Sequence, residues 1–184
     1  MKLLMTILIL GLSVKTFAAD TKLIEYKDWR ADKVEAHKVT GKASCVAKTT
    51  VKGTDTSLEV YAESAGEVEF VQPTVQIVTT DVAPALGVVL KMNPGGQEVP
   101  MTISLKETKT LQKEVMVDGT PTIEEVEQQI FIAKFKDKKS AIEWIRQKNT
   151  VEGKFFNAEG EIAKMNFSLG GSHKSVTTMM DTCL

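Results

Sequence analysis

Apolar and polar residues alternate along most of the chain, which is the pattern of β-strands with one buried and one solvent-facing side. The segment SLEVYAES (57–64) places Leu58, Val60 and Ala62 on one side of such a strand. Turn-forming residues separate the runs, as at the Asp-Gly pair of positions 118–119. The same pattern predicts strands in TVQIVTT (74–80), LGVVLKM (86–92), MTISLKE (101–107), LQKEVMV (111–117), IFIAKF (130–135), TVEGKFF (150–156) and IAKMNFSL (162–169).

Two stretches instead have helical spacing. A helix is predicted over Ser140–Lys148, where Ser140 and Glu143 form a capping box and Asn149 is a stop signal. A second short helix is predicted to begin at Ser172, after the break at Gly170-Gly171, with its apolar positions falling on one face: Val176, Met179, Met180 and Cys183. The segment Thr122–Gln129 leaves helix and strand both open, because Thr-x-x-Glu can start a helix.

These elements predict one mainly β domain, a β-sandwich or partly closed barrel with about eight to ten strands and two short helices. Helices are too few for an alternating parallel α/β sheet. No internal repeat or linker divides the chain, so the single domain is expected to span residues 19–184.

The first 18 residues are predicted to be a secretory signal peptide. Lys2 precedes an apolar run from Leu3 to Leu12, which is shorter than the roughly 20 residues that span a bilayer. Cleavage is expected after Ala18 or, second, after Ala19; a buried N-terminal helix is the alternative. No later segment is apolar enough to cross a membrane, so the sequence predicts a periplasmic or secreted protein.

Export changes how the two cysteines are interpreted. In an oxidising compartment Cys45 and Cys183 are expected to form one disulfide, which would fasten the C-terminal helix to an early strand. Two buried thiols, or one thiol kept for an intermolecular bond, are the alternatives. The spacing of the cysteines with His37 and His173 does not match a zinc site, and no C-x-x-C pair indicates redox chemistry.

Charge limits the class of partner. The whole chain has 23 basic and 24 acidic residues; removing Lys2 and Lys15 with the signal leaves 23 − 2 = 21 basic residues and a net charge of −3. No basic block stands out, which argues against a nucleic-acid surface.

The sequence indicates no catalytic, cofactor or metal site. Ser172 beside His173 lacks the Gly-x-Ser-x-Gly pattern of a nucleophile elbow and is interpreted as a helix cap, although the turn there could bind a small anion. Glu63, Glu67 and Glu69 lack the Asp-rich loop of a calcium site. These acids are interpreted as a solvated strand face.

Aromatic residues are the candidates for contact with a partner. Trp29, in YKDWRA, and Tyr61, in SLEVYAES, would each serve as an anchor if exposed, although packing in the core or at its rim is the default for a tryptophan.

An early DWRA, the segment CVAKTTVKG (45–53) and the late segment VEGKFFNAEGEIAKMNFSLGGS (151–172) resemble the invasion-associated locus B family. Trp29 matches that family's early tryptophan, Cys45 a cysteine near the first strands, and Phe167-Ser168-Leu169 with Gly171 its terminal turn. Ser172 replaces the phenylalanine that commonly follows, and a mid-chain cysteine pair is missing. The resemblance implies an exported, mainly β bacterial protein linked to host-cell entry.

The sequence therefore favours a non-enzymatic binding domain that contacts an envelope component or a target-cell surface. A periplasmic hydrolase with residues scattered along the fold is the alternative, and a cleft gathering His37 or His173 with carboxylates would support it.

Overall fold

The structure is a computed structural model that describes residues 21–34, 44–65, 69–70, 74–92, 99–136, 138–146 and 150–183. The predicted signal peptide and His37 lie outside the described residues.

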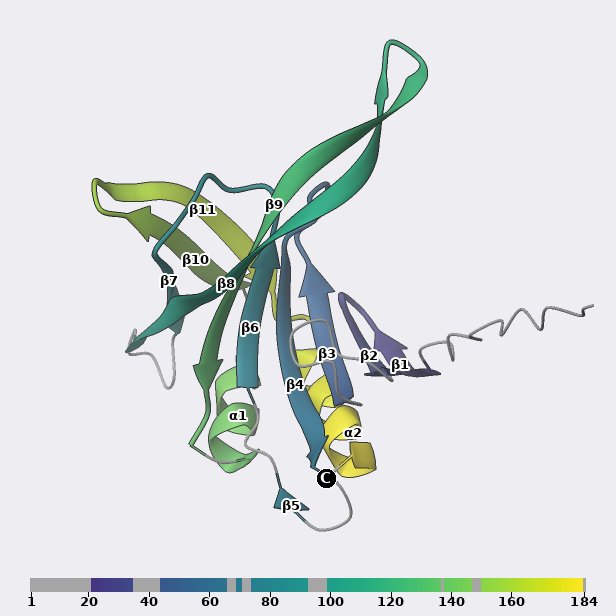
Figure 1. The fold of residues 1–184 in the computed structure, drawn as a ribbon. Helices are drawn as coiled ribbons and strands as arrows, with labels where there is room; N and C mark the ends of the chain where they lie inside the picture. The colour runs from purple at the N-terminus through teal and green to yellow at the C-terminus, as the bar shows by residue number, and fades with distance from the viewer. Residues whose placement is uncertain are drawn as a thin grey trace, which may run out of the picture.

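One antiparallel sheet runs in the order β1-β2-β3-β4-β6-β9-β8-β7-β10-β11, and β5 pairs only with β4 (Figure 1). The sheet is not closed into a barrel, and two short helices accompany it, so the mainly β prediction is confirmed. The strands are β1 (Thr21–Tyr26), β2 (Trp29–Val34), β3 (Ser44–Thr50), β4 (Ser57–Ala65), β5 (Glu69–Phe70), β6 (Thr74–Thr79), β7 (Gly87–Met92), β8 (Val99–Val117), β9 (Thr120–Lys134), β10 (Thr150–Asn157) and β11 (Gly160–Ser168).

The two ends of the curved sheet meet at one corner. The indole N–H of Trp29 donates to the carbonyl oxygen of Ser168 at 2.7 Å. The backbone N–H of Asp28 donates to the carbonyl oxygen of Gly170 at 3.2 Å. The turn between β1 and β2 is thereby joined to the end of β11. At the same corner Gly171 has a φ of 92°, and an added Cβ would overlap the carbonyl oxygen of Tyr26. Glycine is therefore required where this turn approaches β1.

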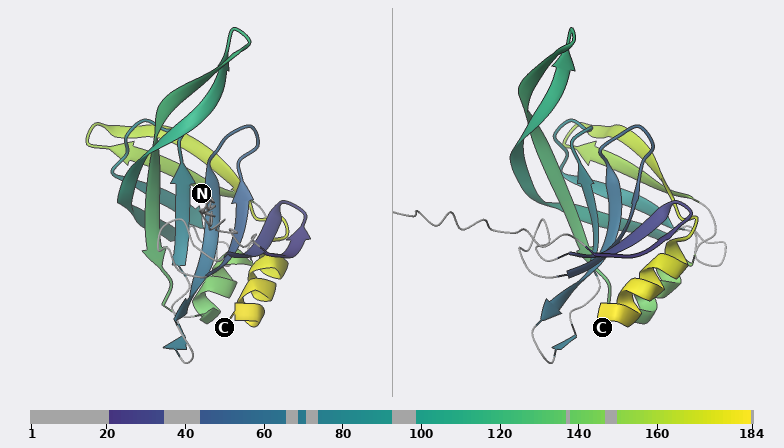
Figure 2. Two further views of the ribbon diagram at one scale, coloured as in Figure 1. Left: turned by 45° about the vertical axis from the view of Figure 1, so that its right-hand side comes forward. Right: turned by 90° about the vertical axis from the view of Figure 1, so that its right-hand side faces the viewer.

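The core lies on the concave side of the sheet. Trp29, Phe131, Phe155 and Phe167 are its largest fully buried side chains, and the rings of Phe131 and Phe155 meet edge to face with centroids 5.7 Å apart. Helix α1 (Lys138–Ile145) and helix α2 (Ser172–Cys183) cover one end of it (Figure 2).

The apolar stripe of α2 determines how that helix packs. Val176, Met179 and Met180 are buried against the core, and the helix contacts β1 to β4. Burial of each such side chain contributes about 1.5–3 kcal/mol. The same stripe directs Cys183 to β3, where it forms a disulfide with Cys45 across a Cα–Cα distance of 6.2 Å. That distance lies in the ordinary range for this bond.

Two local predictions need correction, and one segment that was left open is resolved. Helix α1 begins at Lys138, so Ser140 lies inside the first turn rather than at the cap, and the capping box with Glu143 is wrong. Segment 122–129, left open between helix and strand, belongs to β9. The runs 101–107 and 111–117 are parts of a single strand, β8, rather than two strands.

Candidate functional site

Strands β8 and β9 extend well beyond their neighbours. β7 pairs with β8 only over residues 99–104, and β6 pairs with β9 only over residues 129–134. The remainder, residues 105–128, forms a two-stranded arm that projects from the sheet (Figures 1 and 2). Its tip is a two-residue turn in which Asp118 and Gly119 have φ values of 49° and 80°, the conformation that Asp-Gly favours in hairpins.

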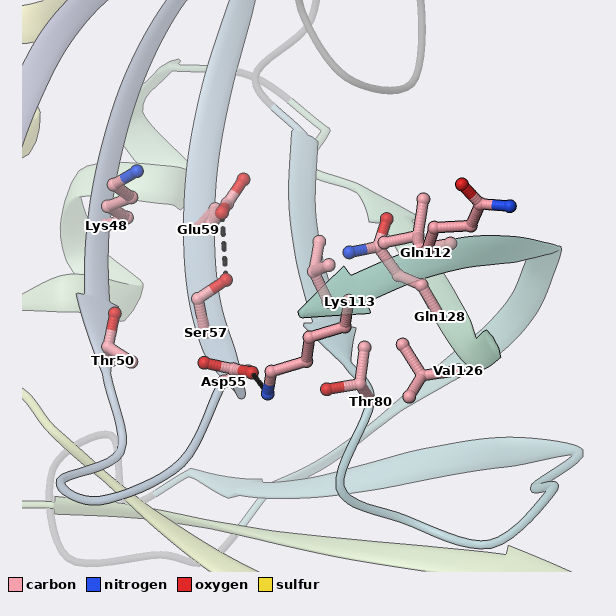
Figure 3. A pocket seen from close by; sticks show the side chains of 12 residues that line it. Lys48, Thr50, Asp55, Ser57, Glu59, Thr80, Gln112, Lys113, Val126 and Gln128 are labelled. Carbon is pink, nitrogen blue, oxygen red and sulfur yellow. Dashed lines mark hydrogen bonds and ion pairs between the residues drawn. The ribbon is translucent and has the colours of Figure 1, made fainter. Parts of the chain in front are cut away.

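A groove of about 380 Å³ lies where the arm leaves the sheet (Figure 3). One wall comes from β3, β4 and the residues after β6, which contribute Lys48, Ser57 and Thr80. The other wall is the arm, which contributes Val126 and Gln128 from β9 and neighbouring residues of β8. The lining is mixed: hydroxyl, amide and charged groups alternate with apolar surface from Val78, Leu111 and Val126.

The floor of the groove includes a buried carboxylate. Glu59 is 4 % exposed and accepts a hydrogen bond from the Ser57 hydroxyl at 2.8 Å and another from the Gln76 side-chain amide. Lys48 stands directly across the β3–β4 ladder from Glu59. Hydrogen bonds of this kind satisfy a carboxylate that burial would otherwise destabilise.

An ion pair joins the arm to the β3–β4 turn across this groove. Lys113 of β8 donates to the carboxylate of Asp55, as the dashed line in Figure 3 shows. That hydrogen bond, together with the negative charge of Asp55, raises the pKa of Lys113 above its usual value. The pair is open to solvent, so it positions the arm more than it stabilises the fold.

The edge of β9 is left open because the chain after β6 turns away from it. Asp81 accepts hydrogen bonds from the Asp55 backbone N–H and the Thr56 hydroxyl, both at 2.8 Å, which hold the chain toward β4. The Gln129 side chain then donates to the Val82 carbonyl and accepts from the Ala85 N–H on the core side. Within the described ranges, β8 is the only strand that pairs with β9 over residues 120–128.

The aromatic residues that were candidates for contact with a partner lie inside the fold, which is the default packing predicted for Trp29. Trp29 is 1 % exposed and Tyr61 is 5 % exposed. Burial removes the basis for expecting either one at a partner surface. Trp29 instead connects the two ends of the sheet, as described above.

Ser172 has a structural role, but the helix cap predicted for it is wrong: Ser172 is the first residue of α2, and the first helical hydrogen bond runs from the Ser175 N–H to the Gly171 carbonyl oxygen. The Ser172 hydroxyl is buried and is the donor to two carbonyl oxygens, that of Ile145 at 2.7 Å and that of Leu169 at 2.8 Å. The Leu169 oxygen also accepts from the Ser172 backbone N–H at 3.1 Å. His173 Nε2 accepts a hydrogen bond from Arg146 at 3.1 Å. Neither contact activates the serine as a nucleophile.

A second cavity, of about 360 Å³, lies at this corner and is lined by four basic side chains: Lys27, Arg146, His173 and Lys174. Lys174 Nζ lies 4.5 Å from the centroid of the Tyr26 ring, a cation–π contact, and Arg146 bonds to His173. Lys27 Nζ lies 5.7 Å from the same centroid, so the two lysines and Arg146 each already have a contact within the protein.

Among the described residues, no group of three or more His, Cys, Asp or Glu side chains is placed to hold a metal ion. The side chains of Glu63, Glu67 and Glu69 lie outside the described set. No helix in the described part of the chain is long and apolar enough to cross a membrane.

Comparison of the chain with protein-family models, curated proteins and solved structures finds no match. The resemblance to the invasion-associated locus B proteins therefore stays a prediction. The Trp29–Ser168 contact does join the two motifs that carry this resemblance.

Sequence reasoning missed the arm and its groove. The signal available was the high charge of residues 106–128 combined with four apolar residues that turn out to be exposed: Leu111, Met116, Val117 and Ile123. A strand whose apolar positions face a core would not also carry this density of Lys and Glu.

Proposed function

We propose that this protein is an exported binding domain that holds an extended polypeptide segment of an envelope or target-cell partner in the groove at the base of the arm. The observation that carries the proposal is the open edge of β9 beside that groove. Unpaired backbone donors and acceptors on a strand edge bind other extended chains. The mixed polar and apolar lining of the groove suits a polypeptide backbone with side chains of both kinds.

The shape of the arm supports the same proposal. A two-stranded ribbon gains little stability by itself in water, so packing alone does not account for its length. Met116 and Ile123, on the arm near its tip, are 67 % and 60 % exposed. A partner that buried these two side chains would remove exposed apolar surface from water, which favours binding.

The test is a selection of random twelve-residue peptides displayed on phage against the immobilised mature protein, residues 19–184. Peptides that survive selection are then measured against Thr80→Trp, which fills the groove, and Glu159→Trp, a matched change at the exposed β10–β11 turn. We expect Thr80→Trp to lose binding and Glu159→Trp to retain it, with the thermal midpoint of both variants unchanged.

Two results would contradict the proposal. One is a selection that enriches no peptide, and the other is a set of peptides that bind Thr80→Trp as tightly as the parent protein. Turnover of a generic ester, peptide or glycoside substrate by the mature protein would favour the hydrolase instead.

A further inference from the structure

The two faces of the arm differ in charge. Paired residues of an antiparallel ladder share a face, and neighbours along a strand alternate between faces. The register therefore places Lys109, Lys113 and Glu124 on the face that meets the groove. The opposite face, which we name the acidic face, consists of Thr108, Thr110, Gln112, Glu114, Met116, Pro121, Ile123, Glu125 and Glu127.

The acidic face carries three carboxylates and no Lys or Arg. Glu114 stands opposite Ile123, Glu125 opposite Gln112, and Glu127 opposite Thr110, so none of the three has a basic residue as its cross-strand partner. In the part of the chain that the structure describes, no ion pair joins these carboxylates to a cation. These exposed carboxylates are therefore available to pair with a basic partner.

The two edges of the arm differ as well. β8 carries Lys106, Lys109 and Lys113 and has a register shift between Leu105 and Glu107. Lysines, proline and bulges are among the features by which proteins protect an edge from further pairing, and on this part of β9 the one such feature is Pro121, which precedes Thr122–Gln128. Between Thr120 and Gln128, β9 has no lysine or arginine. Its ladder with β8 is regular along that stretch.

We infer that the open edge of β9 accepts a basic, extended segment of a partner polypeptide, which adds as a strand over Thr122–Gln128. This inference rests on the proposed function and specifies its partner. The added strand runs antiparallel to β9, in line with β6, whose last paired residue, Thr79, faces Gln129. About seven residues of the partner span this stretch, at one residue per ladder position.

Register also defines the pattern of the partner segment. The two partner residues opposite Glu125 and Glu127 would lie on the acidic face and be two positions apart in the partner segment. Lys or Arg at alternate positions of that segment would therefore pair with both glutamates. The residue between them stands opposite Val126 on the groove face and is apolar. The segment therefore alternates basic and apolar residues.

The test uses the full mature protein and the peptide acetyl-Lys-Val-Lys-Val-Lys-Val-Lys-amide, labelled for fluorescence anisotropy. We expect it to bind at least about tenfold more tightly than the same peptide with Glu in place of Lys, because two attractive cross-strand pairs become repulsive. The variant E125K/E127K should lose about tenfold in affinity for the lysine peptide. The variant E143K/E159K, with the same change of charge at exposed sites away from the arm, should retain it.

Two N-methylated isomers separate strand addition from simple charge attraction. Methylating the backbone nitrogens of the valines blocks one edge of the peptide, and methylating those of the internal lysines blocks the other. A strand added to β9 uses one edge, so one isomer should bind and the other should not. Equal binding of both isomers, or equal binding of the lysine and glutamate peptides, would overturn the inference.

Two outcomes separate this inference from the proposed function. If selected peptides bind in a manner sensitive to Thr80→Trp but the lysine peptide does not bind, the proposed function stands and the inference falls. If the protein sediments as a dimer that E125K/E127K dissociates, the edge belongs to a second copy of this chain, and the inference again falls.

Discussion

Removing the disulfide should lower stability by an amount that the structure allows to be calculated. Cys45 and Cys183 are 138 residues apart in the sequence. The chain-entropy relation assigns about 5 kcal/mol to closing a loop of this length in the unfolded state. Residual structure in the unfolded chain reduces that figure, so we expect Cys183→Ala to cost about 4 kcal/mol.

The folded state should survive this loss. Val176, Met179 and Met180 remain buried against the core without the bond. A loss of about 4 kcal/mol is nevertheless a large part of the 5–15 kcal/mol that separates most folded domains from their unfolded chains. The variant should therefore fold with a much lower denaturation midpoint.

Urea denaturation, followed by the fluorescence of Trp29 and Trp144, measures the effect. Cys45→Ala, Cys183→Ala and the double variant should lose the same free energy of unfolding within about 0.5 kcal/mol, because each removes the same link. Reductant should lower the parent to that level and leave the double variant unchanged. The reasoning would be refuted if reductant left the stability of the parent protein unchanged. It would also be refuted if the double variant lost twice the free energy of unfolding that either single variant loses.

Three further changes test local features of the fold. Gly153→Ala should destabilise by about 2 kcal/mol, because its Cβ would lie 2.9 Å from Cε2 of Phe167, and thermal unfolding measures this. Ser172→Ala should cost about 1 kcal/mol in the same assay, since it removes the hydroxyl that bonds to the Ile145 carbonyl oxygen, while the Leu169 oxygen keeps the Ser172 backbone N–H as a donor. Asp55 raises the pKa of Lys113, so the ion pair should persist when the pH exceeds the usual pKa of a lysine. It should be lost only when the pH rises above the raised pKa of Lys113. Asp55→Asn should therefore speed amide exchange in the arm at neutral pH, whereas an arm with unchanged exchange would contradict the anchoring role.

Periodicity predicted the strands well because each alternation reflects local side-chain burial. It also located the second helix, since the break at Gly170-Gly171 and the apolar stripe of α2 are both local signals. The start of the first helix was misplaced: Ser140 and Glu143 match a capping pattern, but the helix begins two residues earlier, at Lys138. Helix ends are where local preference is weakest.

The groove could not be predicted, because it depends on the lengths of strands that are remote in sequence. The arm exists because β6 ends at Thr79 and β7 pairs no further than Ser104, while β8 and β9 continue. Nothing within residues 105–128 specifies where their neighbours stop. Burial of Trp29 was the default prediction for a tryptophan, but its hydrogen-bond partner was not predictable, because Ser168 lies 139 residues away in the sequence.

The most direct test of the account is hydrogen exchange of the mature protein with and without a saturating concentration of the lysine–valine peptide. Binding should protect backbone amides of β9 between Thr122 and Gln128, while the amides of β8 from Thr108 to Lys113 keep their exchange rates. Protection that falls instead on the corner formed by Lys27, Arg146 and Lys174, or that is spread evenly over the surface, would contradict the assignment of the binding edge to β9.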